Sequence, residues 1–125
     1  MLMIAALAAL TLAAQDAGQW QDFGAGSDGV GIAVNLDSIE RTDQGTEAMV
    51  RWRLPRPDAH GATQADTLSR FDCGARTVTR LRLVSHNAQG AVTDRDDDGE
   101  AMAPVRAAAG TPIGEVLDLV CSMSG

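Results

Sequence analysis

The sequence has no lysine and no tyrosine, and all ten of its basic side chains are arginines. They are outnumbered by 17 aspartates and glutamates, so the formal net charge of the 125-residue chain is -7. A chain with this charge repels the phosphate backbone of DNA and RNA, and we therefore expect no nucleic-acid partner. Domains usually contain about 100–150 residues, so the length allows one domain and excludes a multidomain enzyme.

Cysteine is also scarce: Cys73 and Cys121, which lie 48 positions apart, are the only two. They form no CxxC pair and have no histidine at ligand spacing, so zinc-binding and thioredoxin-like chemistry are unsupported. In an exported protein, an even number of cysteines predicts one structural disulfide, worth about 4 kcal/mol for a loop of this length. In a cytosolic protein the same residues would be two buried free thiols.

No apolar run reaches the ~20 residues that a spanning helix needs. The longest, residues 1–14, is uncharged, and its Leu12 and Ala14 suit positions -3 and -1 of a signal-peptide cleavage site. It predicts a signal peptide over residues 1–14, followed by a domain over residues 15–125. The alternative is a buried N-terminal helix of a cytosolic protein. No cysteine follows the run, so we expect no N-terminal lipid anchor and no integral membrane segment in the mature chain.

Alternation of apolar and polar residues predicts a series of short strands. The clearest covers residues 46–54, with Val50 and Trp52 on one face and Arg51 and Arg53 on the other. Further strands are predicted at residues 19–23, 32–34, 67–73, 76–86 and 91–93. They are joined by a helical turn at 36–40, an exposed connection at 58–66 and a hairpin turn at 87–90.

After Pro104 the spacing of apolar residues becomes helical. Thr111 is the predicted N-cap and Pro112 the first helical residue, where its missing N–H costs nothing. Apolar side chains between residues 113 and 120 form one stripe, with Cys121 beside it. We expect this helix to pack on the sheet face that carries Val50 and Trp52, and a disulfide to join it to the strand at 67–73.

Four segments in this order form a recognisable pattern. They are a turn after a short strand at residues 34–41 (VNLDSIER), a tryptophan-containing strand at 48–52 (AMVRW), the segment FDCGAR at 71–76, and a proline, short helix and Val-Cys pair from Pro104 to Cys121. From Trp20 to Cys121 the chain resembles the bacterial surface-adhesin protein E family.

This resemblance implies an α+β fold, a single domain with an antiparallel β-sheet of about five to six strands and a C-terminal helix packed on one face. It also implies export to the envelope and a disulfide between Cys73 and Cys121. The better-known members bind host matrix components and self-association is reported for the fold, so a protein or glycan ligand and a homodimer are the expected partners. Two properties of the family are not expected for this chain. Without lysine we expect no basic binding segment, and without a lipid-anchor cysteine we expect no outer-membrane anchoring. No cofactor is expected.

Residues 94–100 contain the acidic pattern D-x-D-x-D-G. In an EF-hand-type loop, Asp94, Asp96 and Asp98 would supply the first ligands and Gly99 the sharp turn. The closing glutamate is replaced by Val105, and no helical pattern flanks the segment. A weak calcium site is one interpretation; the other is a solvated acidic loop that protects a sheet edge.

No catalytic residue is predicted. Residues 24–29 match G-x-G-x-x-G by letter, but a strand-like segment follows where a dinucleotide site needs a helix, so a turn is expected. The histidines, His60 and His86, are expected at the surface, since the sequence has no G-x-S-x-G motif and its thiols are expected to be bonded.

Arg51, Arg53, Arg80 and Arg82 are predicted to line one face of the sheet. Such a row can bind carboxylates, sulfated sugars or an acidic protein segment. Alternatively, it is a solvent-facing surface paired with nearby acidic residues. Trp52 is expected in the core, whereas Trp20 would either pack on the sheet or be exposed.

Together these patterns predict a periplasmic or secreted cell-envelope protein that acts by binding and not by catalysis. The leading hypothesis is an adhesin E-like protein that recognises a protein or glycan ligand through its sheet face. The alternative is a periplasmic structural or envelope-maintenance protein without an external ligand, and a small hydrolase is the third and weakest.

Overall fold

The computed structural model describes residues 18–97 and 102–123. The predicted signal peptide at residues 1–14, and Asp98 of the predicted calcium loop, lie outside the described residues. In chain order, the described helices and strands are β1 (Trp20–Ala25), β2 (Gly31–Asn35), the 3-10 turn η1 (Leu36–Ser38), β3 (Glu40–Thr42), β4 (Gly45–Arg53), β5 (Ala62–Asp72), β6 (Thr77–Asn87), β7 (Val92–Asp96), β8 (Val105–Arg106) and α2 (Pro112–Met123).

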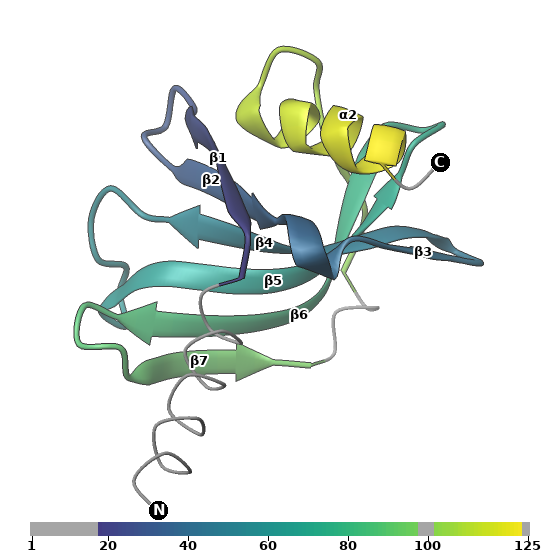
Figure 1. Cartoon of the computed structure of the whole chain (residues 1–125). Coiled ribbons are helices and arrows are strands. Elements are labelled where there is room, and N and C mark those ends of the chain that lie inside the picture. Colours follow the sequence, from purple (N-terminus) through teal and green to yellow (C-terminus); the bar gives the residue numbers. More distant parts are fainter. Residues whose placement is uncertain (1–17, 98–101, 124–125) are drawn as a thin grey trace, which may run out of the picture.

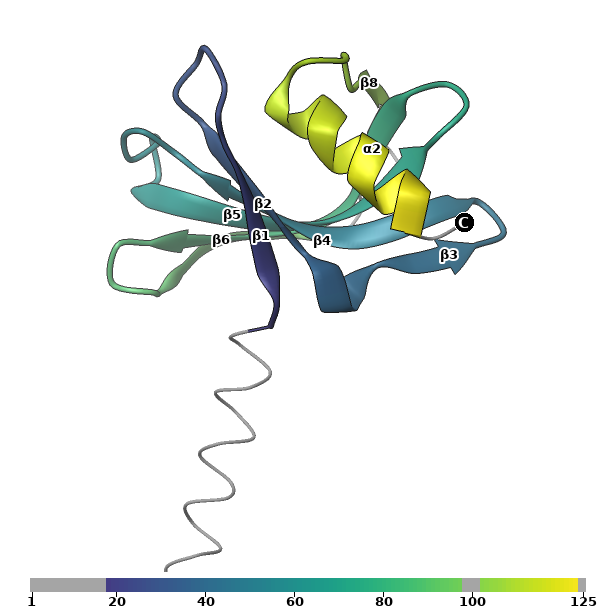
Figure 2. The same cartoon turned by 45° about the horizontal axis from the view of Figure 1, so that its top comes forward.

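The strands form one antiparallel sheet in the order β1-β2-β4-β5-β6-β7, with β3 beside β4 and β8 beside β6. The sheet curls into a half-barrel, and α2 lies against its concave side (Figures 1 and 2). The predicted α+β class, the antiparallel sheet and the C-terminal helix are therefore confirmed. The strand number is slightly higher than expected, because the short β3 and β8 carry no apolar alternation.

The core lies between the concave face and α2. Val34 of β2 pairs with Val50 of β4, and both side chains are fully buried. From α2, Val116, Leu117 and Val120 complete the core, as the helical stripe predicts; burying a side chain of this size contributes about 1.5–3 kcal/mol. The core cluster comprises Ile32, Val34, Ala48, Val50, Phe71, Val78, Ala107, Val116, Leu117 and Val120.

A disulfide joins the helix to the sheet. Cys73 directly follows β5 and Cys121 lies in the last turns of α2; the two are bonded, with their Cα atoms 5.9 Å apart. None of the described cysteines is free, so the alternative of two free thiols is wrong. In the chain-entropy account, a bond across this separation stabilises the fold by about 4 kcal/mol.

The start of α2 is also as predicted. Thr111 Oγ1 accepts a hydrogen bond from the Gly114 N–H at 3.2 Å, and Pro112 is the first helical residue. Gly114 is buried, and a methyl group there would overlap the carbonyl oxygen of Ala108. The glycine therefore lets the chain that precedes the helix pack against its first turn.

Two connections are shorter than the sequence predicts. The exposed connection at residues 58–66 ends early because β5 begins at Ala62, and the acidic loop begins later because β7 extends to Asp96. In the first half of β5 the inward side chains are as small as Ala65, so apolar alternation is missing. β7 is an edge strand with mostly polar residues, and its hydrogen bonds to β6 define it.

Replacing Gly114 with alanine tests the close contact at the start of α2. Helix propensity alone favours alanine by about 1 kcal/mol. We expect instead a loss of about 2 kcal/mol in the free energy of unfolding, because the added methyl group meets a backbone oxygen. Urea denaturation measures whether the substitution raises or lowers the free energy of unfolding. Gly74→Ala is the matched control, since its Cβ would meet only Asp72 Oδ1 at an ordinary 3.7 Å, and equal effects of the two changes would contradict the interpretation.

Candidate functional site

The helix covers only part of the concave face, and the remaining part is an open groove of about 500 Å³. Its walls come from β4, β5 and β6, the β1–β2 turn, β8 and the first turn of α2. We call it the concave groove, and it is lined mainly by apolar atoms. Its lining residues are Asp28, Val30, Trp52, Leu54, Ala65, Thr67, Ser69, Val78, Arg80, Leu83, Val105, Arg106 and Ile113.

Trp52 forms a wall that hydrogen bonds keep in place. Its indole N–H donates to Thr67 Oγ1 at 3.0 Å, and Thr67 Oγ1 lies 2.9 Å from Ser69 Oγ. Half-buried Trp52 packs against the core, as the strand pattern predicts, and its remaining surface faces the groove. The polar atoms of this wall therefore pair largely with each other, which leaves an apolar, preorganised surface.

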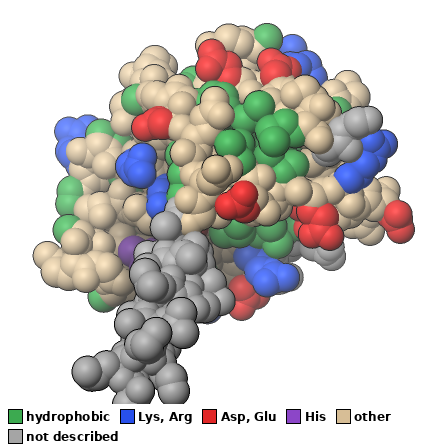
Figure 3. Space-filling model, in the orientation of Figure 1, with side chains coloured by type: hydrophobic (Ala, Val, Ile, Leu, Met, Phe, Trp, Pro, Cys, Tyr) green, Lys and Arg blue, Asp and Glu red, His purple; other side chains and the backbone are tan. Residues whose placement is uncertain are grey.

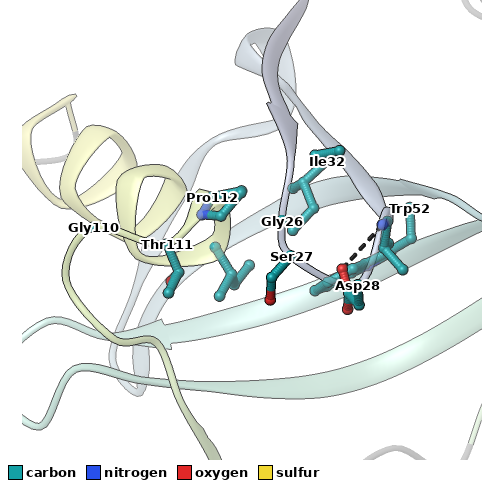
Figure 4. A pocket seen from close by; sticks show the side chains of 11 residues that line it. Gly26, Ser27, Asp28, Ile32, Trp52, Gly110, Thr111 and Pro112 are labelled. Atoms are coloured by element: carbon teal, nitrogen blue, oxygen red, sulfur yellow. Dashed lines mark hydrogen bonds between the residues drawn. The ribbon is translucent and has the colours of Figure 1, made fainter.

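A second cavity, of about 480 Å³, adjoins the concave groove at the start of α2. Figure 4 shows Thr111 and Pro112 on one side of it and Ser27 and Asp28 of the β1–β2 turn on the other. The Asp28 carboxylate accepts a hydrogen bond from the Val30 N–H at 3.0 Å, which holds this turn. The two cavities are neighbours, since Asp28, Val30, Trp52 and Ile113 line both of them.

A β-bulge determines which face Arg80 reaches. In the β5–β6 ladder, Ser69 lies opposite Arg80 and Leu68 opposite Arg82, so Leu81 is the extra residue. Paired residues in a ladder share a face, and Ser69 is buried on the concave side. Arg80 therefore lies on the concave face and Arg82 on the convex face, although a regular strand would place them together.

The Arg80 guanidinium is only partly satisfied. Its Nη2 donates to Asp96 of β7 at 2.8 Å, while its Nε is buried and has no hydrogen-bond partner among the described residues. A buried donor without an acceptor costs about 1–3 kcal/mol. Of the residues that the structure describes in β4, β5 and β6, Arg80 is the one charged side chain on the concave face.

The other predicted arginines lie on the convex face, so the expected row of four is split. Arg51 forms a bidentate ion pair with Asp66, at 2.9 and 3.1 Å, and its guanidinium carbon lies 4.0 Å from the centre of the Trp20 ring. Arg53 lies 3.8 Å from Asp22 in an exposed pair, and Arg82 is exposed. The Arg51 guanidinium therefore binds side chains of the sheet itself.

Charge on the face seen in Figure 3 is mixed. Acidic and arginine side chains are interspersed there, and hydrophobic side chains gather near its centre. Among the residues that the structure describes, neither sign forms a large patch in this view.

The predicted calcium ligands are only partly within the described structure. Asp94 and Asp96 lie on β7 and not in a loop, and Asp96 is engaged by Arg80. Asp98 falls outside the described residues. In residues 18–97 and 102–123, no group of three or more His, Cys, Asp or Glu side chains is placed to hold a metal ion.

The remaining motifs form turns and surface. Residues 24–29 lead into the β1–β2 turn, closed by a hydrogen bond from the Gly29 N–H to the Gly26 carbonyl at 3.0 Å, as expected for a turn. His60 is exposed in the β4–β5 turn. His86 is half-buried on β6, at a polar depression that also includes Arg51 and Asp66.

A family model for Surface-adhesin protein E matches residues 20–122. The chain belongs to this family. Neither a curated protein nor a solved structure shows a significant match. Membership of the surface-adhesin protein E family indicates a surface or secreted adhesin-like protein. Among the described residues, no helix is both long and apolar enough to cross a membrane.

Sequence reasoning does not identify the concave groove. Leu54 and Val105 carry no signal beyond being apolar, and Val105 is 63 % exposed on a two-residue strand. Arg80 is among the predicted ligand-binding residues but is predicted on the wrong face, because the alternating pattern gives no sign of the bulge.

The β4–β5 turn provides a pH-dependent contact. The Asp58 carboxylate accepts hydrogen bonds from the backbone N–H groups of Ala62 and His60, both at 2.9 Å, and these bonds lower the pKa of Asp58 from its ordinary value. A lowered folded-state pKa contributes stability above the unfolded pKa, and this contribution is lost as the pH falls through the folded pKa. We expect an NMR titration of Asp58 to have its midpoint below that of an unstructured aspartate. Asp58→Asn should remove this part of the acid sensitivity, and an ordinary midpoint would contradict the hydrogen-bonded turn.

Proposed function

We propose that this member of the surface-adhesin protein E family is an exported binding protein whose ligand inserts an apolar group into the concave groove. The observation that carries the proposal is the uncovered part of the concave face, where Trp52, Leu54 and Val105 leave an apolar depression beside α2. Apolar grooves of about 300–1,000 Å³ with a few polar groups are the usual form of a ligand site.

The groove favours a protein over a glycan as the adhesion ligand. A glycan needs many hydrogen-bonding groups, whereas the Thr67 and Ser69 hydroxyls are already in contact with each other. An apolar side chain of a protein ligand would bury its surface against Trp52 and Ile113, gaining about 25 cal/mol for each Å² removed from water.

A non-enzymatic role fits the chemistry of the chain. Both cysteines are bonded to each other and so are not available as nucleophiles. The adhesin family and the disulfide, which is stable in an oxidising compartment, both support export. The competing hypothesis is a periplasmic structural protein without an external ligand.

Labelling of intact producing cells separates these two hypotheses. An adhesin must be reachable from outside, so an antibody against the folded domain should bind intact cells before the outer membrane is breached; a reagent for lysine or free thiols would have no side chain to label. The intact mass of the purified protein should also show a chain that begins at Gln15. Labelling only after permeabilisation would contradict the adhesin function and favour the periplasmic alternative.

Charge placed in the concave groove should weaken binding. Val105→Asp adds a carboxylate at an exposed position in the groove, where it costs the fold little. We expect binding to immobilised extracellular-matrix proteins to weaken at least tenfold, because the ligand's apolar group would have to desolvate that charge.

Val92→Asp is the matched control, since Val92 is 51 % exposed on β7 and does not line the groove. It should bind as the unaltered protein does. Equal binding of both variants would show that the ligand contacts another surface, and absence of binding to every matrix protein would contradict the proposed protein ligand.

A further inference from the structure

Among the described residues, the concave groove offers one charged side chain that a ligand can pair with. Three of its lining residues are charged, and one of them, Arg80, is paired with Asp96, so these two charges cancel. Val105 of β8 lies opposite a core residue of β6, and alternation along the strand directs the Arg106 side chain to the other face. The third is Asp28, an exposed residue of the β1–β2 turn that lines both cavities.

The Asp28 carboxylate is held in place and still has an oxygen to offer. Its Oδ1 accepts the Val30 N–H at 3.0 Å, whereas no described residue donates a hydrogen bond to its other oxygen. Figure 4 shows Asp28 on the same side of the second cavity as Trp52. A ligand group that binds here must therefore donate a hydrogen bond, and a cation does so most strongly.

The Trp52 ring favours a guanidinium as that cation. A guanidinium is planar and weakly hydrated, so it can stack on an indole ring while it donates to a carboxylate. The convex face already contains such an arrangement: the Arg51 guanidinium lies 4.0 Å from the centre of the Trp20 ring and forms a bidentate pair with Asp66. On the concave side, Trp52 and Asp28 supply a ring and a carboxylate, and a ligand would supply the guanidinium.

We propose that the protein ligand of the concave groove carries an arginine beside its apolar group. The ligand's guanidinium stacks on the Trp52 ring and donates to Asp28, while the apolar neighbour lies against Val105 and Ile113. Asp28 then selects among apolar ligands, and the net charge of -7 attracts a basic partner at longer range. This inference rests on the proposed protein ligand and specifies its chemistry.

An NMR titration of the disulfide-bonded protein with two blocked tripeptides tests the proposal. Acetyl-Leu-Arg-Leu-amide carries the proposed group, and acetyl-Leu-citrulline-Leu-amide has nearly the same shape without the charge. At about 0.15 M salt, which screens charges beyond about 8 Å, the arginine peptide should bind saturably and at least about threefold more tightly. The Trp52 indole N–H signal should shift, and the ring current should move the arginine side-chain protons upfield.

Asp28→Asn removes the charge and keeps an oxygen for the Val30 N–H, so the turn should be retained. The arginine peptide should then bind only as tightly as the citrulline peptide. Asp37→Asn is the matched control: Asp37 is exposed, lines neither the groove nor the second cavity, and its substitution changes the net charge equally. This variant should keep the preference for arginine. Thermal unfolding verifies that both variants are folded.

The proposal is overturned if the arginine peptide shows no saturable binding, if the two peptides bind the unaltered protein equally, or if the two aspartate substitutions have equal effects. Binding without the upfield shift would also overturn it, because the guanidinium would then lie away from the ring.

The adhesion proposal fails separately. If Val105→Asp weakens binding to a matrix protein but the peptides show no preference, the groove binds its protein ligand without an arginine contact, and the inference is wrong. If the arginine peptide binds as described and no matrix protein does, the arginine site stands and the adhesion does not.

Discussion

The placement of α2 over one part of the concave face is the constraint on which the rest of the structure depends. At its C-terminal end the helix is joined to the β5–β6 turn by the Cys73–Cys121 bond and by the ion pair between Arg76 and Asp118 at 2.7 Å. At its N-terminal end, Gly114 allows close packing against the chain that enters the helix. Because both ends are fixed, the helix cannot shift to cover the remaining apolar surface, and that surface becomes the concave groove.

Residues of the motifs shared with the surface-adhesin protein E family make specific contacts in this fold. In the FDCGAR segment, Phe71 is fully buried, Asp72 accepts a hydrogen bond from the Ala75 N–H at 3.0 Å, and Cys73 bonds the helix. In the earlier turn, Ser38 Oγ donates to the Asn35 carbonyl at 2.7 Å and accepts the Met49 N–H at 2.8 Å. These two segments therefore attach turns to the sheet and the helix, whereas the AMVRW strand of the same pattern contributes Trp52 to the groove.

The arginines of the convex face show why a row of like residues is weak evidence for a ligand. Arg51 lies directly opposite Asp66 in the β4–β5 ladder, and Glu47 directly opposite Arg70, so each forms a cross-strand ion pair. Such pairs contribute roughly 0.2–1 kcal/mol each to the sheet. The alternative of arginines paired with nearby acidic residues thus describes Arg51 and Arg53, and Arg80, which the bulge places on the concave face, is paired as well, with Asp96.

The sequence by itself determined the features that depend on local periodicity and local hydrogen bonds. The alternation around Val50 defines β4, Thr111 and Pro112 define the start of α2, and the apolar stripe defines its buried face. Only the tertiary structure decided the extent of β5 and β7, the face that Arg80 reaches and the existence of the groove. The reason is that a strand with small or polar side chains is defined by its partners, a bulge by the register between two strands, and a groove by how much of a face the distant helix leaves uncovered.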